Sequence, residues 1–296
     1  MQEKISVIIT TYKRKFNILS RAINSVLNQT YQNIEIIVVN DNSIDNTFFS
    51  EIEENIKKYQ NQIKYISYPD NKGACAARNL GALEARGKYI AFLDDDDVFR
   101  PDKIERQVYF LHKLSADFVT CSYATLGENR KNRKVNVNQY KIIKRNKIWK
   151  RNCIGGCSEP LMSKEVFIKA GMFMENLPQS QDYDLWIRIA KICKIYKINE
   201  ELVEYSREDE NSISKNYKKI IIASKMLAEK YKNEKEAQEF IKRMYYVIAY
   251  SLICMNEKNK AKIYYEKGKQ IKKSNIYIWR YKIKIMCEIL RRFKEK

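Results

Sequence analysis

Short apolar runs and longer amphipathic segments follow one another along the first part of the chain. Residues 5–10, 34–40 and 89–93 are short, apolar and rich in β-branched side chains, which is typical of strands buried on both faces. Segments with helical spacing lie between them; in residues 16–27 the apolar side chains fall on one face of a helix. This alternation predicts βαβ units, and therefore a mostly parallel sheet flanked by helices in the α/β fold class.

The pattern changes near residue 215. Beyond it the sequence holds a single glycine, Gly268, and the apolar residues follow helical rather than strand spacing. We therefore expect two domains, an α/β domain over residues 1–214 and an all-helical extension over residues 215–296.

The last segment of the chain is basic and amphipathic. Residues 274–296 carry seven Lys or Arg and two Glu, a net charge of +5, and one apolar stripe formed by Trp279, Ile283, Met286, Leu290 and Phe293. Such a helix can lie on an anionic membrane surface. It can equally pack against the preceding helices or form a homodimer contact.

The charge and the one histidine narrow the possible chemistry. The chain has 296 residues and a formal net charge of +20, which favours an anionic partner such as nucleic acid, a nucleotide-bearing ligand or a membrane surface. No nucleic-acid-binding module is apparent, so specific nucleic-acid binding is not expected. The single histidine, His112, lies in an amphipathic segment and is expected on a helix surface. Any general base is therefore expected to be a carboxylate.

The cysteines and the apolar runs point to a location. The seven cysteines are scattered and form no CxxC pair, which predicts reduced thiols rather than a zinc site. The N-terminus has no signal-peptide pattern, and no apolar run reaches the roughly 20 residues that a membrane span needs. We expect a cytoplasmic protein, either soluble or peripherally bound to the inner face of the cell membrane.

Four consecutive acids, Asp94–Asp97, follow the predicted strand 89–93, and Asp41 follows the predicted strand 34–40. The carboxyl ends of parallel strands meet at one edge of a sheet, where ligands of such folds bind. Two carboxylates spaced i, i+2 can hold Mg²⁺ or Mn²⁺ together with a diphosphate. The alternative is a solvated acidic turn that caps a helix beginning near Pro101.

Five motifs in order give a more specific interpretation: SVIITTYKR, SVLNQTYQNIEIIVVNDNSIDNT, NKGACAARNLGALEARGKYIAFLDDDD, KAGMFME and QDYDLWIR. Over residues 6–214 the chain resembles the family 2 glycosyltransferases, which have the GT-A nucleotide-sugar-binding fold. The resemblance implies a metal-dependent, inverting hexosyltransferase that uses Mn²⁺ or Mg²⁺. It would move one sugar from a nucleoside-diphosphate sugar, expected to be UDP-linked, to a cell-surface glycan precursor such as a capsule, O-antigen or lipid-linked glycan.

Other readings of the same sequence remain open. One is a catalytically impaired transferase-like protein, and another is a basic protein that binds anionic ligands. A nucleotidyltransferase on the same scaffold would need a glycine-rich phosphate loop after the first strand, and TYKRKFN is not one.

The resemblance assigns a donor site residue by residue. Thr10 and Tyr12 would line the nucleoside site, and Asp41 would bind the base or ribose. Arg78 would lie near the nucleotide, although it can also be read as a helix-surface residue. Within the acid run, Asp94 and Asp96 match the metal-binding pair, with Asp96 in direct contact; Asp95 would reach the ribose, and Asp97 is expected to be a structural cap.

The resemblance also assigns an acceptor side. Asp182 matches the general base, or alternatively a helix N-cap, and Trp186 would anchor the inner face of the same helix. Gly155 and Gly156 match an acceptor-side loop, or an ordinary tight turn. Two departures from the family pattern stand out, since Gln181 replaces a glutamate and residues 208–210 are acids where relatives often place a histidine. A third metal ligand from this last segment is therefore in doubt, although Arg207 could meet phosphate.

Overall fold

The computed structural model describes residues 2–126, 139–206, 216–272 and 285. These residues cluster into two compact units. The first unit comprises residues 1–144, 154–175 and 188–208, and the second comprises 145–153, 176–187 and 209–296. The second unit thus takes in two segments from within residues 1–214, and the predicted domain division at 214 stays a prediction.

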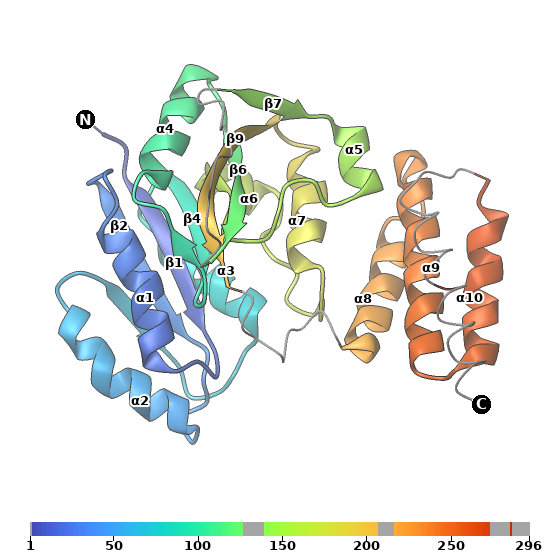
Figure 1. Ribbon diagram of the computed structural model, residues 1–296, viewed down its shortest axis with the longest axis horizontal. Helices are drawn as coiled ribbons and strands as arrows, with labels where there is room; N and C mark the ends of the chain where they lie inside the picture. The colour runs from blue at the N-terminus through green and yellow to red at the C-terminus, as the bar shows by residue number, and fades with distance from the viewer. Residues whose placement is uncertain (1, 127–138, 207–215, 273–284, 286–296) are drawn as a thin grey trace. The chain divides into compact units, whose positions relative to one another are not determined.

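The first unit is built on one sheet, which has nine strands within the described residues (Figure 1). Its order is β3-β2-β1-β4-β8-β6-β9-β5, and β7 pairs with β9. The strands are β1 Ile5–Thr11, β2 Ile34–Asn40, β3 Lys64–Ser67, β4 Tyr89–Asp94, β5 Val98–Phe99, β6 Phe118–Thr125, β7 Tyr140–Ile143, β8 Leu161–Ser163 and β9 Ile195–Tyr205. The three predicted apolar runs are therefore strands, as expected.

The sheet changes character along its width. Strands β1 to β4 pair in parallel, as the βαβ pattern predicts, whereas β8 runs antiparallel to both β4 and β6. Strand β9 is parallel to β6 and antiparallel to β5 and β7. Helical connections join the first four strands to one another in sequence, as parallel pairing requires, and beyond β4 the pairing is mixed.

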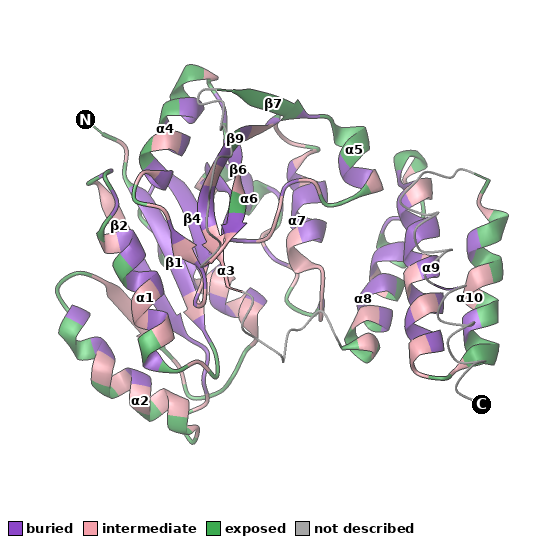
Figure 2. Cartoon of the chain, in the orientation of Figure 1, coloured by how far each residue is buried: buried purple, intermediate pink, exposed green. Residues whose placement is uncertain are grey.

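Helices cover both faces of this sheet. Side chains alternate along β1, so Ile5, Val7 and Ile9 join the core cluster that includes buried residues of three helices: α1 Phe16–Leu27, α2 Thr47–Ile56 and α4 Lys103–Lys113. On the opposite face, a Cβ at Gly81 would meet Ile8. This places α3 Ala74–Glu84 there, and α6 Lys164–Lys169 also packs against β8. Figure 2 shows the strands between these layers as largely buried.

The register of the parallel strands brings the predicted site together. Thr10 lies opposite Asp94 in the β1–β4 pair, and Thr11 lies opposite Asn40 in the β1–β2 pair. Because these three strands end at the same level, the loop after β1, the residue Asp41 after β2 and the acid run after β4 share one edge of the sheet.

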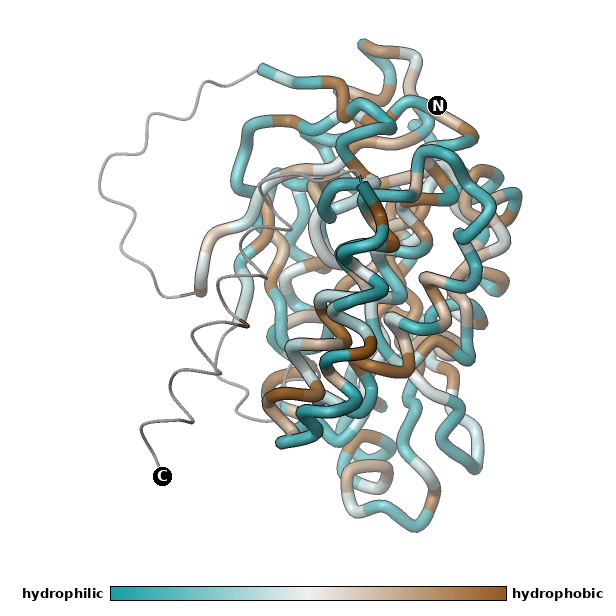
Figure 3. Tube along the Cα trace, turned by 90° about the vertical axis from the view of Figure 1, so that its right-hand side faces the viewer, coloured by the Kyte–Doolittle hydropathy of each residue, from teal (hydrophilic) through white to brown (hydrophobic). Residues whose placement is uncertain are grey.

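The second unit is helical. It contains α5 Arg145–Lys150, most of α7 Gln181–Ile189, α8 Tyr217–Lys230, α9 Gln238–Cys254 and α10 Lys258–Gln270. Helix α9 packs against α8 and α10, and the tube in Figure 3 shows α10 as mostly hydrophilic. Among the described residues no helix has both the length and the apolar character needed to cross a membrane. The basic segment of residues 274–296, with its predicted apolar stripe, lies outside the described residues except for Ile285. Ile285 is not a member of that stripe and is buried in the cluster of α8, α9 and α10.

Candidate active site at the carboxyl edge of the sheet

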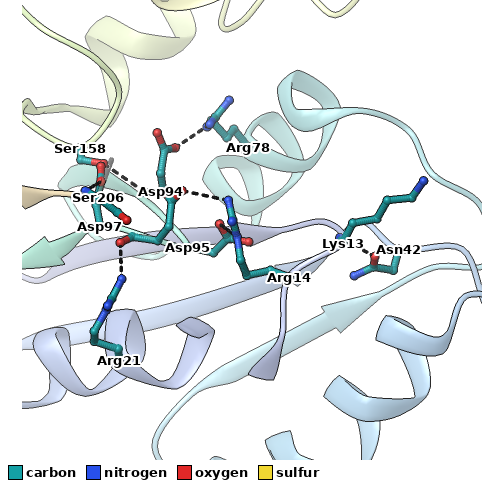
Figure 4. A network of polar contacts seen from close by, with 11 residues as sticks. Lys13, Arg14, Arg21, Asn42, Arg78, Asp94, Asp95, Asp97, Ser158 and Ser206 are labelled. Carbon is teal, nitrogen blue, oxygen red and sulfur yellow. Dashed lines mark hydrogen bonds and ion pairs between the residues drawn. The ribbon is translucent and has the colours of Figure 1, made fainter. Parts of the chain in front are cut away.

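The acid run forms a tight turn at the end of β4 (Figure 4), and partly exposed and buried side chains alternate along it. The backbone N–H of Asp97 donates to the carbonyl of Asp94 at 3.1 Å. Asp94 and Asp96 remain partly exposed, whereas Asp95 and Asp97 are buried. Helix α4 begins only at Lys103 and takes Asp102 as its N-cap, so the run does not occupy the capping position. The alternative of a helix-capping turn is therefore wrong.

Asp94, at the end of β4, is paired with an arginine from α3. Arg78 Nη2 donates to Asp94 Oδ1 at 2.6 Å, and the guanidinium lies over the ring of Phe173, 5.6 Å from its centroid. Only 12% of the Arg78 side chain is exposed. Arg78 is thus turned inward onto the acid run, not outward as a helix-surface residue would be.

Asp95 and Asp96 share a second arginine, which comes from the loop after β1. Arg14 Nε donates to Asp95 Oδ1 at 3.1 Å, and Arg14 Nη2 donates to Asp96 Oδ2 at 2.9 Å. Burial raises the pKa of Asp95 to about 6, although the positive charge of Arg14 acts in the opposite direction. A third arginine, Arg21 of α1, donates through Nη2 to the backbone carbonyl of Asp96 at 2.8 Å.

Asp97 fastens the turn to the rest of the unit. Its carboxylate accepts hydrogen bonds from Ser158 Oγ at 2.7 Å and from the backbone N–H of Ser206, just after β9, at 3.3 Å. Ser158 Oγ in turn accepts from the backbone N–H of Asp94 at 3.1 Å. Burial, followed by the nearby charge of Asp94, raises the pKa of Asp97 to about 8. Asp97 therefore stabilises the turn, in agreement with a structural role, but it caps no helix.

Asp41 organises the neighbouring loop. It is buried, and its carboxylate accepts from Tyr68 Oη at 2.7 Å, from Asn71 Nδ2 at 2.8 Å and from the backbone N–H of Lys72 at 2.8 Å. Burial, followed by the hydrogen bond to Asp41, raises the pKa of Tyr68. Asp41 thus lies at the predicted edge and holds the loop that leads into α3.

The two residues predicted to line the nucleoside site follow β1. Thr10 is partly exposed at the end of the strand, opposite Asp94. Tyr12 is 46% exposed, so its ring is accessible for stacking. Their predicted contacts with a base stay predictions.

Gly155 and Gly156 are closely packed. A Cβ at Gly155 would lie 2.3 Å from Glu159 Oε1, and one at Gly156 would lie 2.3 Å from Tyr205 Oη. Gly155 also has a φ of +134°, which favours glycine. Burial raises the pKa of Glu159 to about 7, and its Oε2 has no hydrogen-bond partner among the described residues. A tight turn over the buried Glu159 therefore requires both glycines. Their acceptor-side role stays a prediction.

The predicted base lies in the second unit. Asp182 occupies the first turn of α7, one residue inside its start, so it is not the N-cap of the helix. It is partly exposed, and Asn152 Nδ2 donates to its Oδ2 at 3.1 Å. Trp186 is fully buried and anchors the inner face of α7, as expected, while its acceptor-side role stays a prediction.

Asp184, two residues further along α7, has a different environment. It is fully buried, and its Oδ1 accepts from Lys230 Nζ and from Tyr231 Oη, both at 2.7 Å. These contacts tie α7 to the end of α8. The structure therefore gathers Asp41, Arg78 and the acid run at one sheet edge and places Asp182 and Trp186 in the other unit.

The oxygen ligands of the acid run fit a hard divalent cation only in part. Within the described residues, no group of three or more His, Cys, Asp or Glu side chains is placed to hold a metal ion. Asp95 and Asp96, however, both face the guanidinium of Arg14, which stands between them as a positive group. Mg²⁺ commonly takes one or two carboxylates and completes its ligands with substrate phosphates. The residues present thus fit a cation that is held jointly with a diphosphate.

Several contacts at this site are absent from the sequence interpretation. The motif SVIITTYKR contains Arg14, but the sequence interpretation gives this residue no role, although it follows β1 at the same sheet edge as the acids. That position is the signal that sequence reasoning could have used, since parallel neighbours present their following loops together. Ser158 and Asn71 gave no such signal, because each reaches its carboxylate through a long-range contact.

A protein-family model and several named relatives match this chain. The model of the family "Glycosyl transferase family 2" matches residues 6–170. A UDP-Glc:alpha-D-GlcNAc-diphosphoundecaprenol beta-1,3-glucosyltransferase of Escherichia coli, WfgD, is 32% identical over 251 residues, which cover 84% of this chain and 92% of that protein. A putative teichuronic acid biosynthesis glycosyltransferase of Bacillus subtilis, TuaG, is 31% identical over 72% of this chain and 82% of its own.

Other matches differ in length or identity. Glycosyltransferases from Rickettsia species are 32–38% identical, but the matched part spans only 28–63% of their length. Among solved structures, Staphylococcus aureus TarS 1–349 in complex with UDP-GlcNAc has a TM-score of 0.61 at 13% identity and covers 90% of both chains. The mannosyltransferase PcManGT of Pyrobaculum calidifontis, in complex with GDP-Man and Mn²⁺, has a TM-score of 0.62 at 14% identity and covers 97% of this chain and 88% of that one.

The family model covers more than half of the chain, and these solved structures share its fold, a curled sheet flanked by helices. The expectations of a GT-A fold and of membership in this family are confirmed. The protein belongs to glycosyl transferase family 2.

Proposed function

We propose that this protein is a glycosyltransferase that moves one sugar from a UDP-linked donor onto a glycan precursor carried on a lipid diphosphate, with the help of Mn²⁺ or Mg²⁺. The observation that carries the proposal is the convergence of Asp95 and Asp96 on one positive group at the sheet edge that also holds Asp41 and Arg78. The named activity of the E. coli relative, whose match spans nearly its whole length, supports the choice of donor and acceptor.

The donor would lie along the carboxyl edge of the sheet. The ring of Tyr12 would stack on the base, and Asp41 would accept a hydrogen bond from the base or ribose. Asp96 would hold the cation together with Asp94, the pair that the resemblance implies. Asp95, which also faces Arg14, is the alternative partner. When bound, Mn²⁺ or Mg²⁺ neutralises charge on the leaving diphosphate. Arg78 orients Asp94 through a charge-assisted hydrogen bond.

Asp182 would act as the general base. It is partly exposed at the start of α7, where the helix dipole favours its ionised form. Its carboxylate would take the proton from the acceptor hydroxyl while that oxygen attacks the anomeric carbon and the bond to the diphosphate breaks. A single displacement of this kind inverts the anomeric centre, so an α-linked donor yields a β-linked product.

The remaining assignments follow from this activity. A UDP-sugar donor and a lipid-diphosphate acceptor place the reaction in the cytoplasm, at the inner face of the cell membrane. The helical extension over residues 215–296 would then serve either as a peripheral contact with that membrane or as a dimer contact. No role for nucleic acid is proposed.

A transfer assay tests the proposal. The full chain is incubated with UDP-glucose or UDP-GlcNAc, Mn²⁺ and a synthetic GlcNAc diphosphate bearing a short lipid, and UDP release and product linkage are measured. We expect acceptor-dependent UDP release from one of these donors and a β-linked product by NMR. An α-linked product would overturn the inverting mechanism. A parallel incubation with GDP- and dTDP-sugars tests the choice of donor, which transfer from these sugars alone would overturn.

A further inference from the structure

Arg14 contacts two carboxylates of the acid run at once (Figure 4). Its Nε lies 3.1 Å from Asp95 Oδ1 and its Nη2 lies 2.9 Å from Asp96 Oδ2. The side chains are 21%, 9% and 24% exposed for Arg14, Asp95 and Asp96, so solvent reaches the arginine and one of its partners. A single guanidinium therefore bridges two adjacent acids at the sheet edge where the donor is proposed to bind.

The Arg14 guanidinium reduces the electrostatic repulsion between the carboxylates of Asp95 and Asp96. Adjacent carboxylates with little exposure destabilise each other, and a positive group between them removes most of that cost. The planar guanidinium suits the task because its donors point in fixed directions and can reach two acceptors together. Without a donor bound, Arg14 thus supplies the positive charge that the acid run requires.

A divalent cation at Asp95 and Asp96 would compete with Arg14 for the same two carboxylates. Mg²⁺ binds carboxylate oxygens at about 2.0–2.1 Å, well inside the distance at which a guanidinium donor lies. Two positive groups so close together also repel each other. The guanidinium must therefore leave Asp95 and Asp96 before a cation can bind them.

We propose that Arg14 is a built-in counter-ion that occupies the cation site until the donor arrives, and that it then rotates to bind the donor diphosphate. The inference rests on the proposed function, because it takes the diphosphate and the cation from it. Arg14 is thereby a positioning residue that couples the binding of the cation to the binding of the nucleotide.

The neighbouring arginines contact the acid run in other ways. Arg78 is 12% exposed and stacks on Phe173, so it is fixed against Asp94. Arg21 Nη2 donates to the backbone carbonyl of Asp96 and not to its carboxylate. Both can therefore stay in place when a cation binds.

The backbone at Arg14 is anchored while the residues before it are accessible. The backbone N–H of Lys13 donates to Asn42 Oδ1 at 2.7 Å, which holds the loop to the end of β2. Tyr12 and Lys13 are exposed. A rotation of the Arg14 side chain toward this exposed side requires no movement of the sheet.

Because Arg14 moves from the carboxylates to the diphosphate, the cation and the nucleotide should bind cooperatively. A cation alone must displace Arg14, which then loses its charge-assisted hydrogen bonds to Asp95 and Asp96. When a diphosphate binds as well, Arg14 gains new anionic acceptors and the displacement costs less. Nucleotide should therefore tighten cation binding, and by reciprocity the cation should tighten nucleotide binding.

The experiment measures Mn²⁺ affinity directly, without catalysis. Free Mn²⁺ is followed by electron paramagnetic resonance during titration of the full chain, first without nucleotide and then with saturating UDP. The variants are Arg14→Gln and Arg14→Lys, with Lys15→Gln as a matched control that removes one positive charge from an exposed neighbour. Asp96→Asn reports whether the bound Mn²⁺ uses the acid run, and circular dichroism confirms that each variant is folded.

We expect Arg14→Gln to bind Mn²⁺ alone about tenfold more tightly than the wild type, and to gain about tenfold less from UDP. Arg14→Lys should fall between the two, and Lys15→Gln should match the wild type. If Mn²⁺ binds in an Asp96-dependent way but Arg14→Gln and Arg14→Lys bind it no more tightly, the inference is overturned while the proposed function stands. If the wild type binds no Mn²⁺ even with UDP, the proposed cation site and the inference fall together.

Discussion

Two acidic segments carry the candidate chemistry, and each pairs an accessible acid with a buried one. After β4, Asp96 is partly exposed, whereas Asp97 is buried against Ser158 and the end of β9. In α7, Asp182 is partly exposed, whereas Asp184 is buried against Lys230 and Tyr231. The buried member holds the segment in place, and the accessible member is available to a ligand.

The comparison teaches how acids of identical chemistry can have opposite roles. Residue type and spacing alone do not separate the members of either pair, since both lie within two positions of each other. What separates them is the set of partners, because a buried carboxylate must be matched by local donors. The expected consequences are loss of ligand binding or turnover for the accessible acids and loss of stability for the buried ones.

The largest expected effect is on turnover. Asp182→Asn keeps the size of the side chain and removes its basicity, so we expect turnover to fall by about 10²–10⁴-fold with little change in the melting temperature. UDP release in the presence of the lipid-diphosphate acceptor measures it. Undiminished turnover would show that another group accepts the proton.

The next effect is on the stability of the second unit. Asp184→Ala removes the acceptor shared by Lys230 and Tyr231, and we expect a loss of about 3 kcal/mol, because breaking a buried ion pair leaves its partner uncompensated. Urea unfolding followed by tryptophan fluorescence reports on this unit, since Trp149 and Trp186 both belong to it. Asp182→Asn is the matched control in the same helix, and equal stability losses in the two variants would erase the distinction between them.

A smaller effect concerns pH. Burial raises the pKa of Glu159 from 4.5 to about 7, so the folded state holds its proton over a range in which the unfolded state has lost it. The contribution of this group to stability is therefore full below about pH 4.5 and is lost as the pH rises to about 7. Glu159→Gln removes this titration.

The melting temperature of Glu159→Gln relative to the wild type should consequently rise by about 3 °C between pH 5 and pH 7.5. Differential scanning fluorimetry at both pH values measures it. A difference that stays constant with pH would show that Glu159 is ionised in the folded protein throughout this range.

The sequence predicts the part of the fold that depends on local pattern. Apolar runs and helical spacing identify β1, α1, β2 and β4, because burial on both faces of a parallel sheet demands those patterns. The antiparallel strand β8 is only Leu161–Ser163, too short to show any period. The inclusion of α5 and α7 in the second unit depends on contacts between distant segments, which no local pattern reports.

The candidate site likewise has a part that the sequence predicts and a part that depends on long-range packing. The carboxyl-edge rule and the family motifs bring Asp41, Arg78 and the acid run together, and the structure agrees. Neither could show that Asp97 is buried or that Arg14 bridges Asp95 and Asp96, because these depend on side-chain packing across loops. The segment 207–215, in which a histidine is replaced by acids, lies outside the described residues.

The central claim is that the acid run holds a divalent cation jointly with the donor. Isothermal titration of UDP into the full chain, with Mn²⁺ or with EDTA, tests it most directly when wild type and Asp96→Asn are compared. The account predicts that UDP binds the wild type at least about tenfold more tightly with Mn²⁺, and that this gain disappears in Asp96→Asn. Equal UDP affinity with Mn²⁺ and with EDTA, or a Mn²⁺ effect that survives in Asp96→Asn, would contradict it.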